Sequence, residues 1–124
     1  MIQETLRNFL FKINQNANWL ELALEIELQP AYIGISGYCI TDLKEEISLR
    51  TKTDDDFDKV IKDFHINTCN DKNKWNKIKF VIKKNKEENL SLIWDEIWQT
   101  QIDRLNVEAK QKNSNYNLPK WSWE

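Results

Sequence analysis

The fold of this chain is decided by the segment WLELALEIEL, residues 19–28. Leucine or isoleucine recurs at every second position from Leu20 to Leu28. Because successive side chains of a strand point to opposite sides of a sheet, this alternation predicts a strand with one buried and one solvated face. The solvated face would carry Glu21, Ala23, Glu25 and Glu27.

Two more strands are predicted directly after this one. The alternation stops at Pro30, and residues 31–40 are rich in the β-branched and aromatic residues that favour strands, which indicates a hairpin. A short third strand is expected over residues 45–50. Gly34 and Gly37 are the only glycines, and each marks either a bulge or a close approach by a neighbouring side chain.

Apolar residues spaced three or four apart predict three helices. The first covers residues 2–13, and the last continues to about residue 112. The second is expected over residues 54–68, where Thr53 and Asp56 resemble a capping box with Asp in place of Glu. The apolar positions are Ile2, Leu6, Phe9, Leu10 and Ile13, then Phe57, Val60, Ile61 and Phe64, then Trp98, Ile102, Leu105 and Ala109.

A second hairpin is predicted before the last helix, with its turn over residues 84–89. The inward faces of its two strands would be Ile78, Phe80 and Ile82, then Leu90, Leu92 and Trp94. The complete order is α-β-β-β-α-β-β-α with short connections. It predicts one α+β domain over residues 1–124, in which about five antiparallel strands carry helices on one face.

The composition is that of a globular protein, with 40% apolar and 31% charged residues. The net charge of −2 argues against binding through phosphate neutralisation. Residues 1–16 lack the apolar run of a signal peptide, and no stretch approaches the length of a membrane span, so we expect a cytoplasmic protein with no membrane partner. Cys39 and Cys69 lack CxxC spacing and are expected to be reduced.

No motif for catalysis, a cofactor or a metal ion is found, and we expect no enzyme. His65 is the only histidine, and no Ser or Cys motif marks a nucleophile for it to activate. It falls near the end of the second helix, where an imidazolium would interact favourably with the helix dipole. Asp95 and Glu96 are expected at the start of the last helix, where carboxylates are favoured.

The charges fall into two clusters of opposite sign. The acidic cluster, Asp54, Asp55, Asp56 and Asp58, suits a first helical turn and would also serve as a partner-binding patch. Consecutive helical residues point about 100° apart, which is poor geometry for a single metal ion. The basic cluster lies in the segment Lys72–Lys86 around Trp75. The basic cluster and Trp75 together suggest an alternative function, a nucleic-acid-binding module that stacks bases on Trp75.

The C-terminal tail, residues 113–124, is rich in tryptophan. Trp121 and Trp123 are two residues apart, so both rings would face the same side of an extended segment. That side would pack either on the domain itself or in a groove of a partner, where tryptophans are common binding hot spots.

The element order and the segment KIKFVIKKNKEENLSLIWD, residues 77–95, resemble bacterial immunity proteins of the YezG type. The chain is also similar to the immunity partners of Maf and contact-dependent growth inhibition toxins. It departs from the family pattern in its Trp-rich tail and sparse glycines.

The resemblance implies an antitoxin that binds the C-terminal domain of a cognate toxin, one copy to one. The toxin, often a nuclease, would be blocked at its active site or substrate groove without any catalysis by the inhibitor. Acidic side chains on a rigid scaffold would match a basic groove. The predicted contact patch is Glu45, Glu46, Asp54, Asp55 and Asp58, with Glu21, Glu25 and Glu27 as the alternative face.

Overall fold

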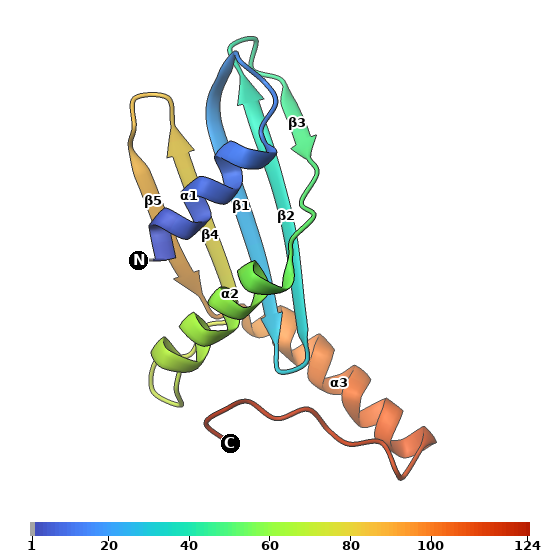
Figure 1. The fold of residues 1–124 in the computed structure, drawn as a ribbon. Helices are drawn as coiled ribbons and strands as arrows, with labels where there is room; N and C mark the ends of the chain where they lie inside the picture. Colours follow the sequence, from blue (N-terminus) through green and yellow to red (C-terminus); the bar gives the residue numbers. More distant parts are fainter. Residues whose placement is uncertain (1) are drawn as a thin grey trace.

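The computed structural model describes residues 2–124 and has the predicted α+β fold (Figure 1). Its five strands form one antiparallel sheet in the order β3-β2-β1-β4-β5. The helices are α1 (Ile2–Ile13), α2 (Asp55–Thr68) and α3 (Glu96–Lys112), and the strands are β1 (Trp19–Gln29), β2 (Tyr32–Thr41), β3 (Glu46–Leu49), β4 (Lys77–Lys83) and β5 (Glu88–Ile93).

Strand β1 is the centre of the sheet, as its alternating pattern predicts. From Leu22 to Leu28 its apolar positions are almost fully buried. The register shifts between Trp19 and Glu21, so Leu20 sits in a bulge and is 40% exposed. This exposure contradicts the prediction that Leu20 joins the buried face.

The two glycines of β2 pair with β1 in regular register, so the bulge alternative is wrong for both. The alternative of a close approach is right. The phenol ring of Tyr32 lies over Gly34 and leaves no room for a Cβ there. At Gly37, a Cβ would meet the Thr51 side chain at 3.3 Å and the Ala23 carbonyl oxygen at 3.4 Å.

Helices α1 and α2 lie across the same face of the sheet and close the core (Figure 1). Phe9 of α1 stacks on Phe57 of α2 with ring centroids 4.4 Å apart. Helix α1 is also tied to β5, because the guanidinium of Arg7 donates hydrogen bonds of 2.8 and 2.9 Å to the two carboxylate oxygens of Glu88. The fully buried side chains include Leu6, Leu10, Leu22, Leu24, Ile26, Cys39, Ile61, Ile78 and Phe80.

The start of α2 differs from the prediction. Asp54 is the N-cap, and its Oδ1 accepts the backbone N–H of Phe57 at 2.8 Å. Thr53 is therefore not the cap, and its hydroxyl donates to Asp58 instead. A capping box needs Glu or Gln at the third helical position, and Phe57 occupies it here.

Helix α3 lies beyond the end of the sheet, near the tip of the β1–β2 hairpin (Figure 1). Its one fully buried side chain is Gln99, whereas Leu105, predicted on the packed face, is 56% exposed. The predicted start is confirmed in outline, since Asp95 caps the helix by accepting the Trp98 N–H. Strand β5 ends at Ile93, so Trp94 is not part of its inward face.

The C-terminal tail returns to α2, where an aromatic cluster surrounds His65. The rings of Trp121 and Trp123 stack with centroids 5.0 Å apart, and Trp121 lies 5.2 Å from the imidazole. The ring of Trp75 packs edge-on against His65, with centroids 4.5 Å apart. In the structure the tail packs on the domain itself, and Trp121 is only 8% exposed.

His65 is a buried, neutral member of this cluster. Its Nε2 lies 3.0 Å from the carbonyl oxygen of Trp75, and since a carbonyl only accepts, this nitrogen carries the proton. Burial lowers the pKa of His65 below its ordinary value, against a smaller opposing effect of the bond to Trp75. His65 therefore lacks the favourable interaction with the helix dipole that an imidazolium would make.

Both cysteines are buried free thiols, in agreement with the expectation from their spacing. None of the helices within residues 2–124 has the length and apolar character needed to cross a membrane.

Candidate functional site

One face of the sheet has neither α1 nor α2 upon it, and we call it the open face. It is built by the positions that alternate with the core residues of each strand. Ala23 and Val81 are its less exposed centre, and most of the side chains around them are polar or charged. Its residues are Glu21, Ala23, Glu25 and Glu27 of β1; Lys77, Lys79, Val81 and Lys83 of β4; Ser36, Tyr38 and Ile40 of β2; Glu46 and Ser48 of β3; and Asn89, Ser91 and Ile93 of β5.

Two stripes of opposite charge run side by side along the open face. The register of β1 and β4 sets three glutamates directly opposite three lysines, in the pairs Glu21–Lys83, Glu25–Lys79 and Glu27–Lys77. Such cross-strand pairs contribute roughly 0.2–1 kcal/mol each. Only Lys77 comes within 4.0 Å of its opposite carboxylate. Within residues 2–124, the exposed charges of Glu25 and Lys79 have no ion-pair partner and can meet another molecule.

The predicted contact patch is divided by the structure. Glu46 pairs with Ile40, which pairs with Glu21, so its side chain belongs to the open face. Asp54 and Asp55 lie at the start of α2, on the side of the sheet that the helices cover (Figure 1). Glu45 lies directly before β3, between this strand and the turn at Asp42 and Leu43. The five residues are therefore brought together in two separate groups.

Two of the α2 aspartates already have partners within the chain. Asp54 caps the helix, and Asp58 accepts a hydrogen bond of 2.9 Å from the Thr53 hydroxyl. Asp55 is exposed, and among the described residues it makes no ion pair. Carboxylates in a first helical turn also stabilise the helix through its dipole. The acidic cluster is thus largely explained by the formation of α2.

Trp75 is not available to stack on a nucleic-acid base. Its side chain is 3% exposed, and its indole N–H donates to the Thr68 hydroxyl at 3.1 Å. Of the neighbouring lysines, Lys79 lies on the open face while Lys74 lies over the ring of Trp94. The aromatic part of the predicted nucleic-acid site is therefore wrong.

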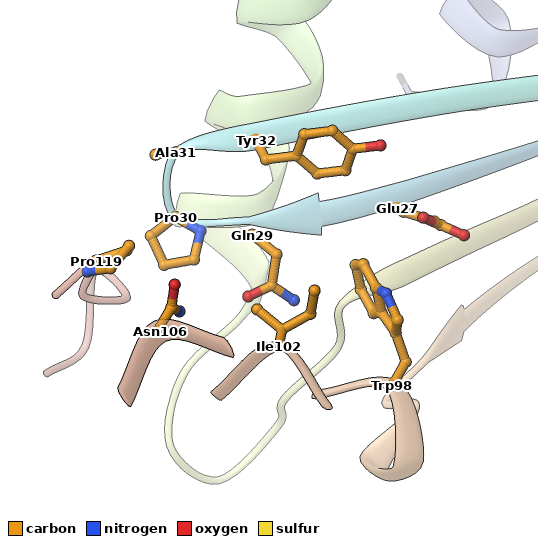
Figure 2. Close-up of a pocket in the computed structure, with 9 residues that line it drawn as sticks. All are labelled: Glu27, Gln29, Pro30, Ala31, Tyr32, Trp98, Ile102, Asn106 and Pro119. Carbon is orange, nitrogen blue, oxygen red and sulfur yellow. The ribbon is translucent and has the colours of Figure 1, made fainter. Parts of the chain in front are cut away.

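A cavity of about 300 Å³ lies at the end of the open face, between the β1–β2 hairpin and α3 (Figure 2). We call it the hairpin–helix pocket. Figure 2 shows Pro30 and Pro119 toward one end and Glu27 with Trp98 toward the other. Its walls are mainly apolar, as is usual for sites that take a side chain or a small ligand. The residues used below are Glu27, Pro30, Tyr32, Trp98, Ile102 and Pro119.

Lys77 links the open face to this pocket. Its ammonium donates to the Asp95 carboxylate at 2.7 Å and lies 5.0 Å from the centre of the Trp98 ring. The hydrogen bond from Lys77 lowers the pKa of Asp95 below its usual range, and the hydrogen bond from the Trp98 N–H lowers it further. Asp95 therefore remains a carboxylate at neutral pH, while Lys77 reaches Glu27 only at 4.0 Å.

The pocket was missed by the sequence interpretation. Its walls come from a hairpin and a helix that are about 70 residues apart, joined by the paired side-chain amides of Gln29 and Gln99. The one available signal was Gly34, because a glycine inside a strand indicates the close approach of another group. That group is Tyr32, which forms one wall.

Among residues 2–124, no group of three or more His, Cys, Asp or Glu side chains is arranged to hold a metal ion. A comparison of the sequence with models of protein families and with curated proteins found no match.

Proposed function

We propose that this chain is an immunity protein, a non-catalytic inhibitor that binds the C-terminal domain of a bacterial toxin. One copy would bind one toxin domain and cover its active site or substrate groove. The resemblance noted for the sequence suggests the class of partner, and the open face offers a surface for it.

The observation that carries the proposal is the pair of charge stripes on an otherwise uncovered sheet face. A partner with a basic strip facing the β1 glutamates and an acidic strip facing the β4 lysines is attracted in one orientation. Displaced sideways by one strand, the same partner would meet like charges. The stripes therefore favour one partner and one way of docking.

We place the contact on the open face in preference to the start of α2. The carboxylates of Asp54 and Asp58 are engaged within the chain, whereas those of Glu21 and Glu25 have no ion-pair partner among residues 2–124. The sheet also holds its side chains on a rigid backbone, which lowers the entropy lost on binding.

The proposal predicts a toxin gene next to this one, and the test is co-expression with the C-terminal domain of that toxin. The wild-type chain is expected to restore growth of cells that produce the toxin, and to form a one-to-one complex by size-exclusion chromatography with light scattering. The control is a chain with Glu21→Lys and Glu25→Lys, whose fold is verified by circular dichroism because the new lysines stand opposite Lys83 and Lys79. This chain should restore growth poorly. If the wild-type chain restores no growth and forms no complex with the toxin domain, the proposal is wrong.

A further inference from the structure

The hairpin–helix pocket has the shape and charge to receive one basic side chain. We infer that it binds an arginine side chain of the protein partner, with the aliphatic stem along its apolar end and the guanidinium beside Glu27. The identity of the partner rests on the proposed function, whereas the chemistry of the pocket does not.

The charge at one end of the pocket favours a cation. Glu27 is the one charged residue among those that line the pocket, and next to it Lys77 is already paired with the carboxylate of Asp95. Lys77 is hydrogen-bonded to Asp95 at 2.7 Å and stands 4.0 Å from Glu27. Within the described chain, no donor makes a hydrogen bond to the Glu27 carboxylate, whose side chain is 43% exposed. A second cation would find this carboxylate open to it.

The opposite end of the pocket suits an aliphatic stem. Pro30 and Pro119 line it beside Asn106, and Ile102 lies between this end and Trp98 (Figure 2). Arginine buries the methylene groups of its side chain along apolar surface while its head group stays with polar partners. The two prolines have fixed backbone φ angles, so this wall loses little freedom when a side chain is bound.

The aromatic walls favour a guanidinium over an ammonium. The ammonium of Lys77 lies 5.0 Å from the centre of the Trp98 ring, so this indole already makes one cation–π contact within the chain. A planar guanidinium stacks on an aromatic face, is more weakly hydrated than an ammonium, and donates two parallel hydrogen bonds to a carboxylate. Tyr32 forms the second aromatic wall, since its ring lies over Gly34, the register partner of Glu27.

Other side chains fit the pocket less well. An acidic side chain would meet the Glu27 carboxylate, with like charges in contact. An aliphatic side chain would desolvate that carboxylate without offering it a hydrogen bond, which costs free energy.

The test uses a blocked tripeptide, acetyl-Gly-Arg-Gly-amide, and the same peptide with neutral citrulline in place of arginine. Each is titrated into ¹⁵N-labelled full-length protein, and the indole N–H signal of Trp98 is followed, after assignment with the Trp98→Phe variant. The arginine peptide is expected to shift this signal to saturation, and the citrulline peptide to leave it nearly unmoved. Glu27→Gln should weaken arginine-peptide binding about threefold to fivefold, the contribution of one part-exposed ion pair.

The matched control is Glu25→Gln, one row further along the same strand and outside the pocket, which should bind as wild type does. Three results would each overturn the assignment. The Trp98 signal does not shift with the arginine peptide, the two peptides bind equally, or Glu27→Gln binds the arginine peptide as the wild type does. The titration needs no toxin. A negative titration beside a stable toxin complex therefore refutes the pocket alone, and a positive titration without any toxin complex refutes the proposed function alone.

Discussion

His65 shows how one buried residue couples stability to pH. Burial lowers its pKa in the folded chain below the ordinary 6.5, so the unfolded chain binds a proton more readily. The free energy of unfolding should be greatest above pH 6.5 and fall as the pH drops from there toward the pKa of the folded state. Urea denaturation at pH 7.5 and pH 5.5 measures the difference.

The His65→Phe variant is the control for this prediction, because His65 is the only histidine of the chain. Its stability should change much less between the two pH values, whatever its absolute stability. Equal pH dependence in the variant and the wild type would contradict a neutral, buried imidazole.

Asp54 is predicted to stabilise α2 through its cap. Asp54→Ala removes the acceptor of the Phe57 N–H and should lower the free energy of unfolding by about 1 kcal/mol. Asp55→Ala, next to it, loses only a favourable position near the helix dipole and should cost about 0.3–1 kcal/mol. Thermal or urea unfolding compares the two, and a larger loss for Asp55→Ala would contradict the cap.

Single residues were the least predictable level from the sequence. Trp75 has lysines next to it in the sequence, yet it is buried. Thr68, Phe64 and His65 of α2 contact its side chain. Neither spacing nor composition shows which residues from a distant helix will cover a given side chain.

At the level of elements, Asn76 is predicted to fasten α3 to the sheet. Its side chain is fully buried, accepts the Asp95 N–H at 2.8 Å and donates to Gln99 at 3.2 Å. Asn76→Ala leaves these buried groups without partners and should lower the free energy of unfolding by about 1–3 kcal/mol. Asn89→Ala, on the exposed open face, should change it by less than about 0.5 kcal/mol.

Urea unfolding of the two variants makes this comparison, and hydrogen exchange locates the loss. Amide protection in α3 should fall more in Asn76→Ala than protection in β1. Similar stabilities for the two asparagine variants would show that the amide network does not hold α3.

The existence of the elements was predictable, because periods of two and of 3.6 residues are local properties. Most of their ends were predictable as well, since α1 covers residues 2–13 and α3 ends at residue 112 as expected. The start of the last strand and the packing of the last helix were not. The fifth strand begins at Glu88, inside the predicted turn, and α3 packs through Gln99 and a hairpin contact in place of a full apolar stripe. A helix held by side-chain amides leaves no periodic pattern to find.

At the scale of the whole molecule, the charges are arranged differently from the two clusters seen in the sequence. The acidic cluster that is compact in the sequence belongs to the cap of α2. The stripes of the open face come from residues that are at least 50 positions apart in the sequence, which only the register of β1 with β4 brings together. Predicting them would have required knowing which strands are neighbours.

The binding surface can be located by measuring the affinity of charge-reversed chains for the cognate toxin domain by isothermal titration calorimetry. Glu25→Lys, on the open face, and Asp55→Lys, at the start of α2, change the net charge equally. We predict that Glu25→Lys weakens binding about tenfold or more, since it replaces an attraction by a repulsion, and that Asp55→Lys stays near the wild-type value. A loss of affinity in Asp55→Lys with none in Glu25→Lys would contradict binding through the open face.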